Sequence, residues 1–301
     1  MIDHEARKKS IGASEIAAVL GCNRYMSPMD VWLVKTGREP PFAGNEHTRR
    51  GQRQEAQIID WLREELQDEN VEILTNFEPI SLKDTIATAT PDGIIIPFTD
   101  SLDSILNSWM YVAGIQLAQC CIVEAKSTLR RVNCVEEIDI SHLMQTQWQM
   151  GVTGIPNAKL CLFGPMVSDY QCFDIRFDPE LFAKMLKQAT EWWERHVVGD
   201  IMPEPISADD AARLWPFDNG GVTDISEDIY RKCCRLREVK DQIKTLESEA
   251  DGLSTEIKIA ARDNREIQYA GVKVATCYTV VPGPPKMPKQ RDPHRVLRLN
   301  L

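Results

Sequence analysis

The sequence lacks any segment suited to a membrane and any paired-cysteine motif suited to a metal. No apolar run approaches the ~18 residues that a transmembrane helix needs, and the N-terminus, MIDHEARKKSIG, has no apolar stretch of signal-peptide type. The nine cysteines are odd in number and form no CxxC, which argues against a disulfide framework and against a zinc or iron–sulfur site. We therefore expect reduced, mostly buried thiols in a cytoplasmic protein.

Positive charge is also in short supply. The 45 acidic residues outnumber the 35 basic ones, and the net charge of −10 argues against a generic nucleic-acid coat protein. A DNA partner would have to meet a local basic surface. Basic residues do cluster in the first half of the chain, at Arg7, Lys8 and Lys9, at Arg49, Arg50 and Arg53, and at Arg130 and Arg131. The chain also lacks an internal repeat, a phosphate-binding glycine-rich loop and a nucleophile elbow.

The pattern of apolar residues predicts an α/β (α+β) fold with a mixed central sheet flanked by helices in residues 1–199. Two short helices are expected within residues 10–37, with Ser14 and Ser27 as their N-caps, and a longer helix begins at Asn45. The elements expected after it are a β-meander (70–98), a strand (120–128), a helix (135–153), two antiparallel strands (157–165 and 170–177) and a helix (179–198).

The last third of the chain has a different composition. Residues 200–223, rich in Pro, Asp and Gly, are predicted to be a linker, and residues 282–301 a basic, Pro-rich tail. Residues 224–281 are predicted to form a long helix and then a β-hairpin that turns at Ala270-Gly271. The helix carries apolar residues at steps of three, four or seven: Ile229, Cys233, Leu236, Ile243, Leu246, Ala250, Leu253, Ile257 and Ala260. This heptad-like pattern predicts a coiled coil or a long helix packed on the core.

The stretch CCIVEAKST (120–128) places a carboxylate and an ammonium two residues apart within an apolar run. In a β-strand the side chains of Glu124 and Lys126 point to one face and Ala125 points to the other. Burying such a pair is costly without partners, and a metal ion and a phosphate would be suitable ones. A short ExK also occurs in ordinary ion pairs at strand ends, so its meaning depends on the rest of the chain.

Two other acids are candidates for the same site. Asp92, in Pro-Asp-Gly, forms either a simple turn or a strand bend that faces a site. The carboxylates of Asp92 and Glu124 and the backbone carbonyl of Ala125 could bind Mg²⁺ or Mn²⁺, which prefer hard oxygen ligands. Glu55, on the helix that begins at Asn45, is either a surface glutamate or a ligand of a second ion or its water. Lys126 would orient the attacking water or neutralise charge on a phosphate, because a lysine base would need a strongly lowered pKa.

The motifs TPDGIII and IVEAKST together resemble the PD-(D/E)xK nuclease superfamily. The flanking blocks IGASEIAAVLG, RRGQRQEA and HLMQTQWQMGVTG, with Arg7 upstream, resemble the YqaJ-type, phage lambda exonuclease-like recombination nucleases. The blocks occur in the family's order and cover roughly residues 5–198. The resemblance implies a restriction-endonuclease-like core.

The resemblance also assigns roles to individual residues. Asp92 and Glu124 correspond to the family's metal ligands and Lys126 to its catalytic lysine. By the same resemblance, Glu55 corresponds to the family's helical acid and Gln145 to a glutamine near the attacking water. Arg7 and Ser14 correspond to a pair that binds a 5′ phosphate. A guanidinium and a hydroxyl suit a phosphate, because both donate hydrogen bonds to its oxygens.

The family's activity is what the resemblance implies for the whole protein. It implies a Mg²⁺-dependent 5′→3′ exonuclease, with Mn²⁺ as a substitute ion, that degrades double-stranded DNA from its ends in a bacterial or phage-infected cell. A trimeric ring and a single-strand annealing protein that receives the 3′ strand are the expected partners. An insertion at 100–118 and the added C-terminal third depart from the family and put the trimer in doubt. An endonuclease and a catalytically inactive DNA-end-binding scaffold are the alternatives.

Overall fold

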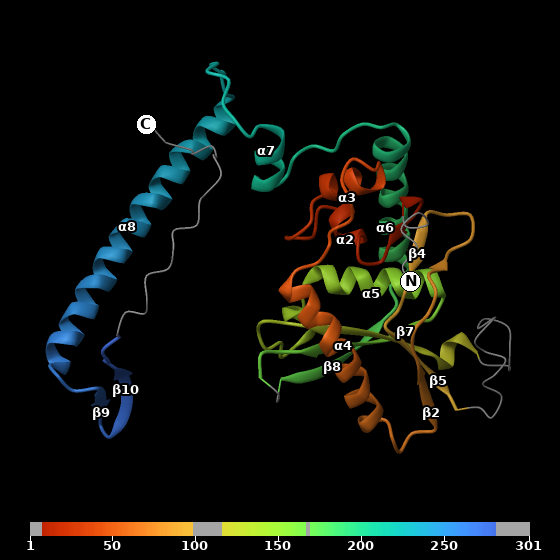
Figure 1. Cartoon of the computed structure of the whole chain (residues 1–301), viewed down its shortest axis with the longest axis horizontal. Helices are drawn as coiled ribbons and strands as arrows, with labels where there is room; N and C mark the ends of the chain where they lie inside the picture. Colours follow the sequence, from red (N-terminus) through yellow and green to blue (C-terminus); the bar gives the residue numbers. More distant parts are fainter. Residues whose placement is uncertain (1–7, 99–115, 167–168, 281–301) are drawn as a thin grey trace. The chain divides into compact units, whose positions relative to one another are not determined.

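A five-stranded mixed sheet forms the centre of the first of two compact units, Met1–Asp210 and Ala211–Leu301 (Figure 1). The structure is a computed structural model that describes residues 8–98, 116–166 and 169–280. The strand order is β2-β5-β6-β7-β8, with the bounds Val71–Leu74, Gly93–Pro97, Cys121–Ser127, Asn157–Phe163 and Tyr170–Arg176. Strand β6 pairs antiparallel with β5 and parallel with β7, which confirms the predicted mixed sheet.

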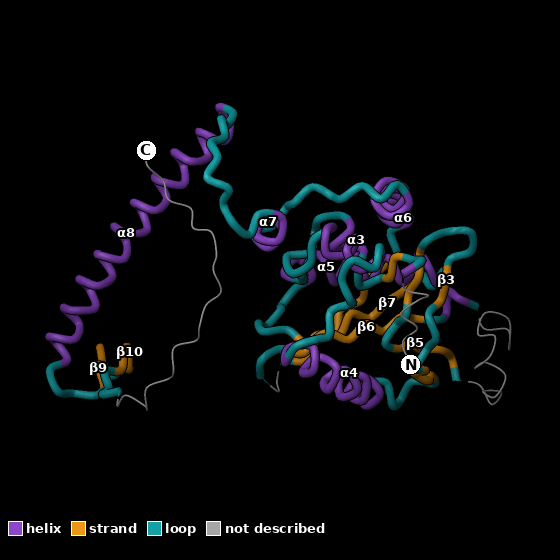
Figure 2. The backbone as a smooth tube through the Cα atoms, turned by 45° about the horizontal axis from the view of Figure 1, so that its top comes forward, coloured by secondary structure: helices purple, strands orange, loops and turns teal. Residues whose placement is uncertain are grey.

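One helix covers each face of this sheet (Figure 2). Helix α4 (Glu46–Glu65) packs Ile58 and neighbouring apolar residues against Val123 and Ala125 of β6. Helix α5 (Ile140–Thr153) packs on the opposite face, where Met150 shares an apolar cluster with Ile122. Alternate residues of β6 therefore enter different cores, as the period of a strand requires.

A third core lies around a small sheet of order β1-β4-β3, with the bounds Ile11–Gly12, Ala87–Ala89 and Ile80–Ser81. Helices α2 (Ile16–Val19), α3 (Pro28–Lys35) and α6 (Pro179–Trp192) pack around it, and a π-helical turn (Trp193–Val198) continues α6. The two strands expected over 70–98 do pair antiparallel, but each is interrupted: β2 pairs with β5 in the main sheet, and β3 pairs with β4 in the small sheet. Strand β4 also pairs parallel with β1, a segment some 75 residues upstream that the local pattern does not contain.

The helix caps divide into one confirmed and one wrong prediction. Ser27 accepts a hydrogen bond from the Asp30 N–H and the Asp30 carboxylate accepts from the Ser27 N–H, a capping box that starts α3. Ser14 is not a cap, because α2 begins after Glu15, and the Ser14 side chain is exposed. Glu15 instead accepts hydrogen bonds from the Gly12 N–H at 2.8 Å and from the Lys35 ammonium at 2.7 Å.

The expectation of nine reduced cysteines is also wrong. Cys161 of β7 and Cys172 of β8 form a disulfide, and the other seven cysteines are free. The two residues stand directly opposite each other in the antiparallel pair, so their side chains lie on the same face of the sheet. The spacing of eleven residues in the sequence contained no sign of that register.

The first unit extends beyond the predicted boundary at residue 199. The segment predicted as a linker, 200–223, contains the helix α7 (Ala208–Leu214), and Asp210 at its start is buried. The Asp210 carboxylate accepts hydrogen bonds from the Ser27 hydroxyl at 2.7 Å and from the N–H groups of Ile206 and Ser207. These bonds fasten the chain up to Asp210 to the start of α3.

The second unit contains α8 (Glu227–Ala261) and a hairpin of β9 (Glu266–Tyr269) and β10 (Val272–Thr276). The hairpin turns at Ala270-Gly271 as predicted, and both residues have positive φ, the requirement of a type I′ turn. The predicted tail (282–301) and nearly all of the predicted insertion (100–118) lie outside the described residues. Among the helices of the described ranges, none is long and apolar enough to cross a membrane.

Candidate active site

The antiparallel register of β5 and β6 brings two distant acids together. Gly93 pairs with Val123, so Asp92 stands one step further along the ladder, opposite Glu124. The Asp92 Oδ2 accepts a hydrogen bond of 2.8 Å from the backbone N–H of Ala125. Asp92 therefore faces a site at a strand bend, the second of the two interpretations that the sequence left open.

Glu124 is completely buried and is surrounded by donors. Its Oε1 accepts hydrogen bonds from the Lys126 ammonium and from the Gln145 amide, the latter at 2.6 Å. Its Oε2 accepts a hydrogen bond of 2.6 Å from the Gln149 amide. A buried carboxylate is tolerated only with such partners. The side chain of Lys126 is 26 % exposed, so it is partly accessible to solvent beside a wholly buried acid.

Helix α5 supplies both amides because Gln145 and Gln149 lie one turn apart on the same face. Gln145 was predicted as a site residue, whereas the role of Gln149 was missed. The spacing of four residues from Gln145 is the signal that could have identified it. Gln147 lies between them on another face and bonds to backbone groups of Arg176 and Asp178. The Oε1 atom of Gln149 is buried without a hydrogen-bond partner in the described structure.

The carboxylates of the site repel one another electrostatically. Burial, and then the charge of Glu124, raise the pKa of Asp92 well above its usual value, against the opposing effects of Lys126 and the Ala125 N–H. Burial also raises the pKa of Glu55, with Lys126 opposing and Glu124 adding to the shift. Three carboxylates thus share a single ammonium, an arrangement that favours a further cation.

Lys126 remains a cation in this environment. Burial favours the neutral amine, but the carboxylates of Glu124, Asp92 and Glu55 outweigh it and raise the pKa of Lys126. The site therefore does not prepare Lys126 as a general base. Burial, and next the charge of Lys126, lower the pKa of His142 to about 4, so a neutral imidazole lies on α5 beside the ammonium.

A hydrogen bond joins α4 to the end of β6. The Ser127 hydroxyl donates to the Gln54 Oε1 at 2.5 Å, and the guanidinium of Arg50 donates to the same oxygen at 3.1 Å. Arg50, one of the predicted basic residues, therefore lies near the end of the strand that carries Glu124 and Lys126. Arg49 and Arg53 lie on the same helix, and Arg130 and Arg131 follow β6 in the sequence.

The donor set fits a divalent cation in kind. Asp92 and Glu124 present hard oxygen atoms of the type that Mg²⁺ and Mn²⁺ prefer, and the negative charge exceeds the positive. Within the described ranges, however, no group of three or more His, Cys, Asp or Glu side chains is arranged to hold a metal ion. The metal-ligand roles of Asp92, Glu124, Ala125 and Glu55 therefore stay predictions.

The structure brings Glu55, Asp92, Glu124, Lys126 and Gln145 together, but it does not test the predicted 5′-phosphate site. Arg7 lies outside the described residues. Ser14 is exposed in the turn before α2. Their predicted role remains untested.

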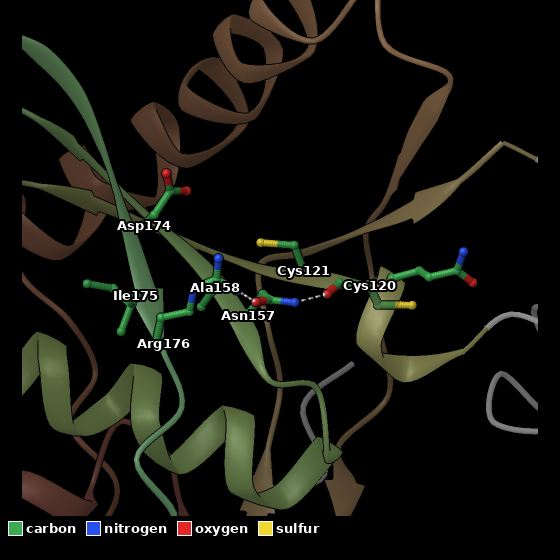
Figure 3. A pocket seen from close by; sticks show the side chains of 8 residues that line it. Cys120, Cys121, Asn157, Ala158, Asp174, Ile175 and Arg176 are labelled. Atoms are coloured by element: carbon green, nitrogen blue, oxygen red, sulfur yellow. Dashed lines mark hydrogen bonds between the residues drawn. The ribbon is translucent and has the colours of Figure 1, made fainter.

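A pocket of about 300 Å³ lies away from this cluster, at the opposite end of β6. Figure 3 shows the side chain of Asn157 directed at the backbone of Cys120, with Cys121 and Arg176 beside it. Burial raises the pKa of the Cys121 thiol to about 11, so this thiol is a poor nucleophile. The pocket shares no residue with the acid cluster, and its chemistry does not suggest a reaction.

The blocks RRGQRQEA, TPDGIII, IVEAKST and HLMQTQWQMGVTG supply the residues that meet at this site, and the order of the blocks along the chain corresponds to a known family. A profile of the YqaJ-like viral recombinase domain matches residues 4–156, just over half of the 301 residues. The chain belongs to this family. The family's profile spans Glu55, Asp92, Glu124, Lys126, Gln145 and Gln149.

Similar individual proteins are more distant. The uncharacterized protein YqaJ of Bacillus subtilis (strain 168) is 24 % identical over 265 residues, which is 85 % of this chain and 76 % of that protein. The solved structure of an alkaline exonuclease from Laribacter hongkongensis has a TM-score of 0.45 and 16 % identity, covering 65 % of this chain and 92 % of its own. A phage-related exonuclease from Haemophilus somnus 129PT has a TM-score of 0.42 and 12 % identity, covering 64 % and 96 %.

Proposed function

We propose that this viral recombinase-family protein is a divalent-metal-dependent nuclease that degrades double-stranded DNA from its ends in the 5′→3′ direction and leaves 3′ single strands. The observation that carries the proposal is the buried carboxylate of Glu124 opposite Asp92, with a protonated lysine two residues away. Neither a plain ion pair nor a structural core requires two further acids at the same point.

Each side chain has a part in the proposed hydrolysis. Asp92, Glu124 and the backbone carbonyl of Ala125 would hold Mg²⁺, which supplies Lewis-acid polarisation of the scissile phosphodiester and lowers the pKa of water. Glu55 would hold a second ion or its water. The ammonium of Lys126 would neutralise charge that develops on the phosphoryl oxygens. Gln145 holds Glu124 in place and contacts the attacking water.

The basic residues near the site support DNA as the substrate. A chain with a net charge of −10 needs a local positive surface to approach a phosphate backbone. Arg50, which donates to Gln54 beside Ser127 at the end of β6, would contribute to such a surface, and Arg49, Arg53, Arg130 and Arg131 are further candidates. Arg7 and Ser14 would bind the 5′ phosphate, and a ring-shaped homotrimer with a single-strand annealing partner, in the cytoplasm of a bacterial or phage-infected cell, remains the expectation from the family resemblance.

A plasmid assay tests the activity. Linear and covalently closed forms of one plasmid are incubated with the full chain in Mg²⁺ or in EDTA. Loss of the linear form alone, only in Mg²⁺, supports the proposal. Cutting of the closed circle would favour the endonuclease, and no cleavage of either form would favour the scaffold.

A labelled duplex tests the direction. A duplex labelled on one 3′ end should keep its label on the remaining 3′ single strand if degradation begins at 5′ ends, and early release of that label would contradict the 5′→3′ direction. The variant Arg7→Ala should slow digestion of 5′-phosphorylated ends more than that of 5′-hydroxyl ends. Equal slowing of the two substrates would remove Arg7 from end recognition.

A further inference from the structure

The long helix α8 exposes a stripe of large apolar side chains. Over its 35 residues, about 52 Å at 1.5 Å per residue, Ile243, Leu246, Leu253 and Ile257 are 49 %, 63 %, 54 % and 50 % exposed. None of them belongs to a buried apolar cluster of the described residues. A contiguous apolar surface of this kind marks a site of association.

The spacing of the apolar residues in this stripe indicates which kind of secondary structure packs against it. Positions in strict alternation of three and four residues define the seam of α8: Ile229, Lys232, Leu236, Val239, Ile243, Leu246, Ala250, Leu253, Ile257 and Ala260. Nine of these ten positions are apolar. A seam of period 3.5 over five heptads fits another helix, whose side chains insert between those of α8. A strand or an irregular peptide would not match that period.

The charges beside the seam decide between the orientations that two copies of α8 could adopt. In a parallel pair, Arg235 of one copy would meet Lys240 of the other, and the two cations would repel. In an antiparallel pair that aligns the two seams, a residue of one copy lies opposite the residue of the other copy that brings the sum of their two numbers to about 489. Arg235 then meets Glu256 of the second copy, and Lys240 meets Glu247 of the second copy. Each attraction occurs twice in the dimer.

The sizes of the seam residues favour the same orientation. A parallel pair would place Ala250 against Ala250 and Lys232 against Lys232, which leaves a gap at one level and a repulsion at another. An antiparallel pair places Ala250 opposite Val239 and Ile243 opposite Leu246. Lys232 then lies opposite Ile257, where its stem can pack while the ammonium reaches water.

We propose that two copies of this chain pair through α8 as an antiparallel coiled coil. The surface is self-complementary, as a two-fold interface requires. The pairing is independent of the nuclease site and of any ring that the first units form. Its consequence is that two nuclease units are linked in one particle, each attached to one end of a shared helical pair.

Site-specific photocrosslinking of the full chain tests the orientation. A benzophenone amino acid replaces Ser254, which flanks the seam, and heavy and light isotopic forms of the chain are mixed before irradiation. The expected product joins residue 254 to residues 231–238 of the other isotopic form. Residue 235 of the same helix lies about 28 Å away, beyond the reach of the probe.

Three other products would overturn the proposal. Crosslinks to residues 249–254 of the second copy would indicate a parallel pair. Crosslinks to residues 8–210 would indicate that α8 packs on the first unit. Failure to form any product between the two isotopic forms at a protein concentration of about 50 µM would mean that the seam does not pair.

Charge reversal provides an independent test. The variant Lys240→Glu turns two attractions per antiparallel dimer into repulsions, and it should raise the concentration for half-maximal crosslinking roughly 4- to 30-fold. Adding Glu247→Lys should restore the original value to within about threefold. In a parallel dimer Lys240→Glu would strengthen pairing instead, so an increase in affinity, or no change, refutes the proposal.

A matched control has the same charge change outside the interface. Lys244 lies one position after Ile243, on the outer side of the helix, and Lys244→Glu should leave the crosslinking concentration unchanged. The loss in Lys240→Glu cannot come from a weaker helix, since the introduced glutamate would gain a favourable pairing with Lys244 four residues later. Equal effects of the two variants would show that only net charge matters, and would overturn the assigned register.

Discussion

The Gln149→Leu variant tests whether the second amide of α5 positions the buried carboxylate of Glu124. The substitution keeps the volume of the side chain but removes the hydrogen bond of 2.6 Å from Gln149 to the Glu124 Oε2. Glu124 would retain its contacts with Lys126 and Gln145 on the other oxygen, Oε1. The carboxylate would then be free to rotate about that anchored oxygen.

The expected stability change is small because two terms oppose each other. Loss of a hydrogen bond to a charged group costs roughly 1.5–3 kcal/mol. The same substitution removes the buried Gln149 Oε1, which has no hydrogen-bond partner among the described residues and which costs about 1–3 kcal/mol to keep buried. The free energy of unfolding should therefore stay within about 1.5 kcal/mol of the parent value.

The functional change should be much larger than the stability change. Residues that orient a metal ligand typically account for about 10–100-fold in metal affinity or activity. Mn²⁺ affinity by calorimetry and cleavage of linear duplex should both fall by about that factor. Both are measured on the full chain, together with urea unfolding by circular dichroism.

Gln147→Leu is the matched control. It makes the same chemical change on the same helix, but Gln147 bonds to backbone groups of Arg176 and Asp178 and not to Glu124. We expect it to lower stability by roughly 1–3 kcal/mol and to leave Mn²⁺ affinity unchanged. Unaltered metal affinity and turnover in Gln149→Leu, or equal losses in the two variants, would refute a positioning role for Gln149.

Three further outcomes are expected. Lys126→Met should lower cleavage by about 100-fold or more with an unchanged circular dichroism spectrum, and near-normal turnover would mean that the site is misassigned. Gly151→Ala would place a Cβ 2.2 Å from the Phe182 ring. This overpacking should lower the stability by roughly 1–3 kcal/mol or more, which exceeds the gain in helix propensity of about 1 kcal/mol, so a raised melting temperature would contradict the expectation. Burial raises the pKa of Cys121 from 9.0 to about 11, so the folded state holds the proton more tightly and this stabilisation is lost as the pH rises from 9 through 11. Between pH 8 and pH 11, Cys121→Ala should lose about 2 kcal/mol less stability in urea than the parent chain, and equal losses would show that Cys121 ionises as it does in the unfolded chain.

Some features of this protein follow from neighbouring residues alone. The face shared by Glu124 and Lys126 follows from the alternation of a strand, and the start of α3 follows from Ser27 and Pro28. The turn at Ala270-Gly271 and the long helix α8 are likewise features of local patterns that the structure reproduces. Each depends on residues at most a few positions apart, where backbone geometry leaves few alternatives.

Only the tertiary structure decided how distant segments meet. The register of β5 against β6 placed Asp92 opposite Glu124, 32 residues away, and a shift of one residue would have turned Asp92 to the other face. The same kind of register joined Cys161 to Cys172. The packing of α5 on the sheet selected Gln149 as a second donor. These arrangements depend on the summed burial of many apolar side chains, and no short stretch of sequence contains that sum.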